Sequence, residues 1–281
     1  MLELSIIIPF YNSSQTIVAS VKSVIQELIG NPYSWELILI DDGSTDNSFE
    51  TIMQYINSTS FISNIKLIKQ KNAGVAAARN SGLKIAKGVF IAFNDSDDKW
   101  LEGKIAVQMN YLLSHREIDM VAGIFDKDNL ASIPLKKMKY ATTITIKNQV
   151  LKNYFSPQTV IFKKKVLDKV GLFNETMRYA EEGYFFNRMA FYGICVVLNE
   201  IVTKPVVQKG RWGDSGLSGN LKEMEKGELF NIRQAYNSNF IGFGLFAFAI
   251  FFSIGKYFRR VLLKRFRLNG SIKNSKREDY D

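Results

Sequence analysis

Short apolar runs alternate with amphipathic stretches along the N-terminal part of the chain. Each run is five or six residues long, rich in β-branched side chains and followed by a polar turn, which predicts a buried strand. Between the runs, apolar residues recur at helical spacing, which predicts helices that pack on the strands. This alternation is typical of an α/β fold with a mostly parallel central sheet flanked by helices. The predicted strands are Leu4–Pro9, Trp35–Ile40, Ile65–Lys69 and Val89–Phe93.

The second half of the chain alternates less regularly and predicts a smaller mixed region. Its apolar runs are unevenly spaced, so no simple strand–helix repeat covers them. We therefore expect an α/β half over residues 1–120, a mixed region of the same domain over 121–239, and a tail over 240–281. The strands expected in the mixed region are Met120–Phe125, Thr142–Ile146, Thr159–Phe162 and Ile194–Leu198.

The tail combines an apolar segment with a basic one. Residues 240–255 are uncharged and mostly apolar, but these 16 residues are fewer than the roughly 20 that span a bilayer. Residues 256–268 interleave apolar side chains with Lys and Arg, which predicts an amphipathic helix on an anionic membrane surface. A buried helix followed by a solvated basic tail is the alternative. Residues 256–281 hold nine basic and three acidic residues, and so carry +6 of the formal net charge of +10.

Composition narrows the class of protein further. Hydrophobic residues make up 46% of the 281 residues and charged residues 23%, which is typical of a globular protein. The single cysteine, Cys195, excludes an intramolecular disulfide, and the single histidine, His115, excludes a metal site with several histidines. We expect His115 near the C-terminal end of a helix, where its charge is favourable. Glu3 stands where a signal peptide would be positive, so we expect a cytoplasmic protein.

Polar residues follow three of the predicted strands. Tyr11 follows the first, Asp41 and Asp42 the second, and Asp95 and Asp97 the fourth. Ligands bind at the carboxyl ends of the strands in sheets of this kind. The last two carboxylates can converge in a turn and suit Mg²⁺ or Mn²⁺, which would bridge a diphosphate. Taken alone, such an acidic turn is more often only solvated.

Two further segments carry side chains that suit a nucleotide. A carboxylate such as Asp42 can accept from a nucleobase N–H or a ribose hydroxyl, whereas we expect Asp46 to cap the next helix. After Gly74, three alanines allow close packing, and Arg79 lies one to two turns into the predicted helix. From there its guanidinium can reach a phosphate or a ribose. The alternative for Arg79 is a surface cation.

Glu181 and Glu182 stand at the start of a later predicted helix. Adjacent carboxylates there face different ways, so one can orient a group while the other accepts a proton. Judged by spacing alone, favourable electrostatics at a helix N-terminus is the better explanation of both acids.

Five motifs occur in register over roughly residues 3–195, and together they resemble a family 2 inverting glycosyltransferase of the GT-A fold. The resemblance implies a nucleotide-sugar donor, Mn²⁺ or Mg²⁺ as cofactor, and inversion at the anomeric carbon. It places the nucleotide sugar in residues 1–120, and the acceptor and the catalytic base in residues 121–239. The motifs are Ile6–Asn12, Ile40–Asp46, Asn72–Asn80, Phe93–Trp100, and Val170–Glu175 with Ala180–Gly183.

The resemblance also assigns residues to the nucleotide. Asp42, together with Asp41, would hold the base and the ribose. Arg79 would lie beside the nucleotide, and Pro9 and Tyr11 would line its pocket.

The remaining assignments concern the metal and the reaction. Asp95 and Asp97 would form the D-x-D motif beside the diphosphate, with Asp97 the direct metal ligand. The family's base is usually the Asp of a Glu-Asp pair; here Glu182 takes that place after Glu181, and its extra methylene moves the carboxylate by about one bond. In the implied single displacement, Glu182 takes a proton from an acceptor hydroxyl, and that oxygen attacks the anomeric carbon opposite the leaving diphosphate.

Gln208–Trp212 resembles the Q-x-x-R-W motif of processive synthases such as cellulose synthase. By that resemblance Trp212 would be a platform for the acceptor sugar, and Lys209 or Arg211 would lie near the diphosphate. Polymer synthesis is not inferred, because the chain lacks the many spanning helices of those enzymes. Gly213–Ser218 is expected to be a loop that orders over the bound nucleotide sugar.

The expected function is transfer of a sugar from a UDP-sugar to a lipid-linked saccharide in cell-surface polysaccharide biosynthesis. Residues 240–277 would attach the protein peripherally to the inner face of the cell membrane. A catalytically inactive scaffold in a membrane polysaccharide-assembly complex is the alternative. A nucleotidyltransferase would need a Gly-rich phosphate loop, which Pro9–Asn12 is not. Nucleic acid is not expected as a partner, because the aromatics of the tail follow an unbroken apolar run; a homo-oligomer is left open.

Overall fold

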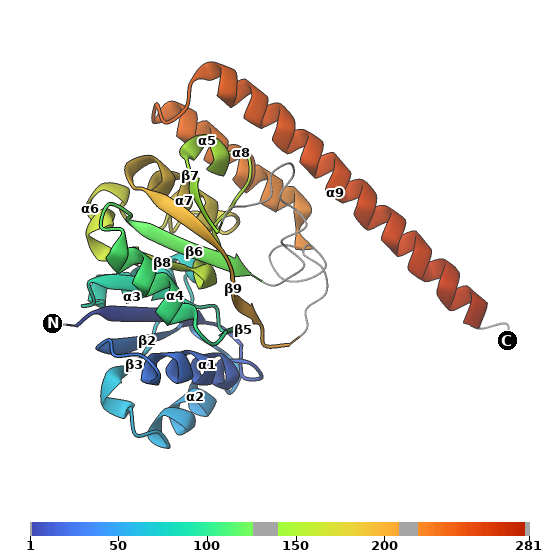
Figure 1. The fold of residues 1–281 in the computed structure, drawn as a ribbon. Coiled ribbons are helices and arrows are strands. Elements are labelled where there is room, and N and C mark those ends of the chain that lie inside the picture. The colour runs from blue at the N-terminus through green and yellow to red at the C-terminus, as the bar shows by residue number, and fades with distance from the viewer. Residues whose placement is uncertain (1, 126–139, 208–218, 279–281) are drawn as a thin grey trace. The chain divides into compact units, whose positions relative to one another are not determined.

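The computed structural model describes residues 2–125, 140–207 and 219–278. The chain divides into two compact units, Met1–Lys209 and Gly210–Asp281. The first unit is built on one sheet, and the second contains two long helices (Figure 1). The expected division at 120/121 falls inside a strand of the first unit, and the expected division at 239/240 falls inside the second unit. A single sheet therefore runs through both halves that the sequence pattern separates.

A mixed sheet, nine-stranded over the described residues, forms the centre of the first unit. Its order is β3-β2-β1-β4-β8-β6-β9-β5, and β7 pairs with β9. β1 runs parallel to β2 and β4, and β2 parallel to β3, because a helix links each strand to the next along the chain. β8 is antiparallel to both β4 and β6, and β9 is antiparallel to β5 and β7 but parallel to β6, so parallel and antiparallel pairings are mixed beyond β1–β4. The strands are β1 (Leu4–Phe10), β2 (Trp35–Asp41), β3 (Ile65–Lys69), β4 (Phe90–Phe93), β5 (Asp98–Trp100), β6 (Met120–Phe125), β7 (Ala141–Ile144), β8 (Val160–Lys163) and β9 (Cys195–Pro205).

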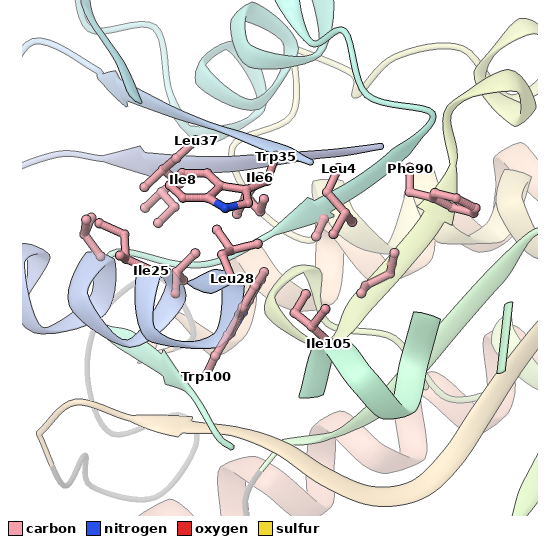
Figure 2. Close-up of a cluster of buried hydrophobic side chains, with 14 of the residues drawn as sticks. Leu4, Ile6, Ile8, Ile25, Leu28, Trp35, Leu37, Phe90, Trp100 and Ile105 are labelled. Atoms are coloured by element: carbon pink, nitrogen blue, oxygen red, sulfur yellow. The ribbon is translucent and has the colours of Figure 1, made fainter. Parts of the chain in front are cut away.

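Helices cover both faces of this sheet. Along β1, Ile6 and Ile8 belong to a buried cluster with α1, α2 and α4, whereas Ile7 belongs to a second cluster with α3 and α7. This alternation follows from the two-residue period of a strand. Figure 2 shows the first cluster, in which Leu28 of α1 lies close to the apolar side chains of the strands. The helices are α1 (Ile17–Ile29), α2 (Ser48–Asn57), α3 (Val75–Ile85), α4 (Lys104–Ser114), α5 (Ile146–Gln149), α6 (Leu167–Val170) and α7 (Glu181–Tyr192).

Six of the eight predicted strands have different bounds in the structure. β1 and β2 each end one residue later than expected, and β8 is shifted by one residue. β4 begins one residue later than expected, because its pairing with β1 starts at Phe90. β7 ends at Ile144, because Thr145 and Asn148 form a capping box that starts α5. β9 continues well past Leu198, since it pairs with β6, β7 and β5 in turn. Hydrogen bonding to neighbouring strands thus makes β9 longer than its apolar sequence pattern predicts.

The second unit contains two antiparallel helices, α8 (Leu221–Asn237) and α9 (Phe243–Glu278). Tyr236 near the end of α8 stacks on Phe246 near the start of α9, and Glu225 early in α8 pairs with Arg260 farther along α9. The apolar and basic segments of the tail form one helix of 36 residues, since no proline interrupts them. In the described part of the chain, no helix has the length and apolar character needed to cross a membrane.

Candidate active site

The carboxyl ends of β1, β2 and β4 lie side by side, because these three strands are parallel neighbours. β1 ends at Phe10, β2 at Asp41 and β4 at Phe93. The polar residues that follow each strand therefore gather at one edge of the sheet. This is the edge at which α/β sheets bind ligands.

A buried hydrogen-bond network around Asn94, which we call the Asn94 clamp, fixes the turn that carries the two aspartates after β4. The side-chain amide of Asn94, which is fully buried, donates to Ser20 Oγ at 2.9 Å and to the backbone carbonyl of Asp98 at 2.9 Å. Ser20 Oγ donates in turn to the carbonyl of Asp95 at 3.0 Å. Asp95 and Asp97 are both half-buried at this fixed turn. The predicted D-x-D pair is therefore presented by a rigid loop anchored on α1.

The carboxylate of Asp42 organises the loop that leads into α3. One oxygen accepts from the side-chain amide of Gln70 at 2.7 Å and from the backbone N–H of Ala73 at 3.0 Å. The other accepts from the backbone N–H of Gly74 at 2.8 Å. Gly74 has a positive φ of 91°, which suits glycine. Asp42 is thus a buried carboxylate that is hydrogen-bonded to the residues directly before α3, the helix that carries Arg79.

Asp41 is fully buried and supports the turn after β2. Its Oδ1 accepts from the backbone N–H of Ser44 at 2.8 Å, and its Oδ2 lies 3.7 Å from Lys69 Nζ. The carboxylate of Asp41 therefore stabilises the turn after β2, and its predicted contact with the base or ribose stays a prediction. Asp46 stands one residue before Asn47, the N-cap of α2, and its carboxylate accepts from the backbone N–H of Ser48, the first residue of the helix.

Arg79 joins segments that lie far apart in the sequence. Its guanidinium donates to Glu181 Oε1 at 2.9 Å and to Asp95 Oδ1 at 3.0 Å, and it lies over the ring of Phe173. The side chain is only 5% exposed, so the alternative of a surface cation is wrong. Burial alone would lower the pKa of Arg79, but Asp95 and Glu181, with Glu182, hold it above its ordinary value. We call Arg79 with these three carboxylates the arginine clamp.

The start of α7 carries the two predicted glutamates. Ala180, directly before them, has a positive φ of 56°, which is uncommon for a residue other than glycine and occurs often at functional sites. Glu181 is buried and turned to Arg79, whereas Glu182 is half-buried. Burial, and next the negative charge of Glu181, raise the pKa of Glu182 above its ordinary value. The two acids therefore have different environments, as the proposed division of roles between them requires.

The other predicted residues have unequal exposure. Pro9 is buried in β1 beside Ile40, while the ring of Tyr11 is 47% exposed just after the strand. Trp212 and Arg211, and the rest of the Q-x-x-R-W segment and its loop, lie outside the described residues. His115 directly follows α4, as expected, and its ring stacks on Tyr111.

The chemistry at this edge suits a divalent cation that also binds substrate. Over the described residues, no group of three His, Cys, Asp or Glu side chains could hold a metal ion. Mg²⁺, however, uses only one or two carboxylates and completes its shell with phosphate oxygens and water. Asp95 and Asp97 supply such hard oxygen atoms, and the arginine clamp sets one cation against three carboxylates. The residues present therefore fit a metal that arrives with a diphosphate.

From the sequence we did not predict the Asn94 clamp or the hydrogen-bond partners of Arg79. Ser20 interrupts the apolar face of the first predicted helix, and Asn94 is an uncharged polar residue inside an acidic turn. Both are signals that a buried polar contact is present. The Arg79–Glu181 contact spans 102 residues and has no local signal.

Comparison with known proteins supports the resemblance to a glycosyltransferase. The model of the family described as Glycosyl transferase family 2 matches residues 5–171. The chain is 39% identical over 150 residues to the Escherichia coli protein UDP-Glc:alpha-D-GlcNAc-diphosphoundecaprenol beta-1,3-glucosyltransferase WfgD, covering 53% of this chain and 55% of that protein. It is 31% identical over 191 residues to the minor teichoic acid biosynthesis protein GgaA of Bacillus subtilis (strain 168), covering 66% and 42%. The chain thus spans about half the length of these relatives.

Solved structures share the fold. Residues 1–349 of S. aureus TarS, in complex with UDP-GlcNAc, match with a TM-score of 0.62 at 20% identity, covering 82% of this chain and 66% of that chain. The mannosyltransferase PcManGT from Pyrobaculum calidifontis, in complex with GDP-Man and Mn²⁺, matches with a TM-score of 0.67 at 14% identity, covering 90% and 73%. The motifs, the fold and the family match over residues 5–171 agree, and the chain belongs to glycosyl transferase family 2.

Proposed function

We propose that the chain is an inverting glycosyltransferase that moves a sugar from a UDP-sugar to a lipid-linked saccharide in cell-surface polysaccharide biosynthesis. The observation that carries this proposal is the arginine clamp. Arg79 holds Asp95 of the D-x-D turn and Glu181 at the start of α7 within hydrogen-bond distance of one side chain. A leaving diphosphate and a proton acceptor must lie close together for a single displacement, and the clamp supplies this proximity.

Binding of the nucleotide is assigned to the loops after β1 and β2. Asp42 is held by three hydrogen bonds, and a carboxylate has about four acceptor sites. A further site is left for a base or ribose donor. The exposed ring of Tyr11 would pack on the nucleotide, and Pro9 would shape the pocket from within β1. Asp41 is fully buried, so we assign it to holding the turn that positions Asp42.

Glu182 is the proposed general base. It accepts the proton of an acceptor hydroxyl as the acceptor oxygen bonds to the anomeric carbon and the bond from that carbon to the diphosphate breaks. The raised pKa of Glu182 makes its ionised form a stronger base. Glu181 is held by Arg79 and cannot turn freely, so it orients its neighbour and the start of α7.

Asp97 and Asp95 would hold Mn²⁺ or Mg²⁺. When bound, such an ion would neutralise charge that develops on the leaving diphosphate. Direct ligation is assigned to Asp97, as the resemblance to the family implies, while Arg79 holds one oxygen of Asp95. The Asn94 clamp keeps this turn in place before substrate arrives.

The names of two relatives support the choice of acceptor. The E. coli relative is named for transfer from UDP-Glc to a diphosphoundecaprenol-linked sugar, and the B. subtilis relative for teichoic acid biosynthesis. We propose that this chain also uses a lipid-linked acceptor. Residues 240–277 would attach it to the inner face of the cell membrane. Arg211 and Trp212 stay predicted contacts of the diphosphate and the acceptor sugar.

Hydrolysis of a UDP-sugar without acceptor, in the presence of Mn²⁺, tests the enzyme assignment. The wild-type protein should release UDP, because water can replace the acceptor hydroxyl. Asp97→Ala should reduce UDP release to background, because it removes the proposed metal ligand. Asp168→Ala, which changes an exposed aspartate on α6, is the matched control and should keep wild-type activity.

A wild-type protein that neither hydrolyses UDP-sugars nor binds any nucleotide sugar in a thermal-shift panel with Mn²⁺ would contradict the proposal. That result would favour the non-catalytic scaffold. Equal activity of Asp97→Ala and wild type would instead overturn the metal assignment.

A further inference from the structure

The long helix α9 turns its polar side toward α8. Ser253 Oγ donates to Glu225 Oε1 at 2.9 Å, and the Arg260 guanidinium donates to Glu225 and Glu228 at 2.8 Å each. Lys264 Nζ donates to the carbonyl of Gly219 at 3.1 Å. Ser253, Arg260 and Lys264 lie seven and four residues apart, so they share one side of the helix. Two cations of the cationic face expected from the sequence, Arg260 and Lys264, are therefore already hydrogen-bonded to α8 and to the residue Gly219 before it.

The opposite side of α9 is apolar and exposed. Phe251 and Phe258 each stand two residues before a residue that faces α8, and two residues turn a helix by about 200°. Phe251 is 78% exposed and Phe258 59% exposed. We call this side the apolar face of α9. Its exposed large apolar residues are Phe243, Phe248, Phe251, Phe252, Ile254, Phe258, Leu262 and Leu263.

Exposed apolar side chains gathered along one side of a helix mark an interaction site, and Arg265, seven residues after Phe258, adds a cation to the same side. Aromatic and aliphatic side chains along one side of a helix are typical of a helix that lies in the boundary between lipid headgroups and acyl chains. A helix that spans the acyl region would need apolar side chains all round. The pairing of Arg260 with two glutamates on the other side instead fits a helix that lies along the membrane surface.

Charge decides between a membrane and a second copy of the chain. No Asp or Glu occurs over residues 229–277, and Arg259 and Arg265 of α9 are exposed. Two copies of α9 that met through their apolar faces would bring cations together without acids from this segment to pair with them. Lipid phosphates supply that negative charge.

We propose that the apolar face of α9 inserts into the headgroup boundary of a lipid bilayer, with Glu225 and Glu228 of α8 holding the opposite side of the helix away from it. This inference deepens the membrane attachment in the proposed function and rests on it. It differs from attachment by a basic tail, because apolar burial supplies the affinity and anionic lipid only adds to it. Binding should therefore persist on neutral lipid and in salt.

The test is co-sedimentation of the full-length chain with vesicles of phosphatidylcholine alone, at low and at high salt. We expect wild-type binding that changes little with salt. Phe251→Ser should weaken binding by about tenfold or more, because a buried phenylalanine contributes that much to transfer from water. Ile62→Ser is the matched control, since Ile62 is 52% exposed in the first unit, and it should bind as wild type does.

Three outcomes would overturn the inference. Binding only to anionic vesicles, lost in salt and unchanged by Phe251→Ser, would assign attachment to the basic residues. Absence of vesicle binding together with a dimer that Phe251→Ser dissociates would assign the apolar face to a second copy. If the protein neither binds vesicles nor forms such a dimer, the apolar face does not insert into a bilayer. UDP-sugar hydrolysis in the same samples is independent of these results, and its loss in wild type would defeat the proposed function instead.

Discussion

Each unit of the molecule contains an arginine that bridges two carboxylates, but the two networks differ in charge. In the first unit, Arg79 donates to Asp95 and Glu181, with Glu182 close enough to act on its pKa. In the second unit, Glu225 and Glu228 face two cations, Arg260 and Lys256. The first network therefore keeps an excess of negative charge, whereas the second is balanced.

The difference in net charge indicates whether each network needs a further charged partner. A balanced network between neighbouring helices needs no further partner, and it fixes which side of α9 faces α8. An excess of carboxylates at the edge of a sheet is costly unless a cation joins it. Under the proposed function, a divalent ion that arrives with a diphosphate would balance the first network, whereas the second network orients α9 against α8.

Removing Arg79 should have the largest effect on stability. Arg79→Met leaves two carboxylates without their cation, and breaking a buried ion pair in this way costs about 3–5 kcal/mol of the free energy of unfolding. Urea unfolding followed by tryptophan fluorescence measures it, because Trp35 and Trp100 are buried in the first unit. A loss below about 1 kcal/mol would show that the arginine clamp does not hold the site together.

Arg260→Met should cost less. Arg260 is 17% exposed against 5% for Arg79, and Lys256 remains near Glu228 after the change. We expect a loss of about 1–2 kcal/mol, measured by far-UV circular dichroism of the helices during thermal unfolding. A loss equal to that of Arg79→Met would contradict the distinction between the two networks.

The burial of Glu182, and next the charge of Glu181, should also appear as a pH dependence of stability. The folded-state pKa of Glu182 is raised, so the folded protein keeps a proton that the unfolded chain releases as pH rises above the ordinary glutamate value of 4.5. Stability should therefore fall with rising pH up to the raised pKa, by at most about 1.4 kcal/mol per pH unit. Glu182→Gln should make this part of the pH profile flatter, and an unchanged slope would exclude Glu182 as its source.

The sequence predicted the first half of the fold well, because its buried strands are nearly continuous apolar runs. It could not predict the direction of β8, since pairing with β4 and β6 depends on distant segments rather than on the pattern Val160–Lys163. The carboxylates after β4 and at the start of α7 were identified from motifs, but their meeting at Arg79 depends on the tertiary fold. Likewise, the apolar stripe of α9 was visible in the sequence, whereas its pairing with Glu225 and Glu228 was not.

The most direct test of the central claim compares Glu182→Gln with wild type for UDP release and for UDP binding in Mn²⁺. The exposed glutamate change Glu200→Gln is the control. We predict that UDP affinity stays within about threefold, while the rate of UDP release from the UDP-sugar falls at least about 100-fold, because only the proton acceptor is lost. A rate that stays close to that of Glu200→Gln would contradict the claim that the start of α7 supplies the base to a site assembled around Arg79.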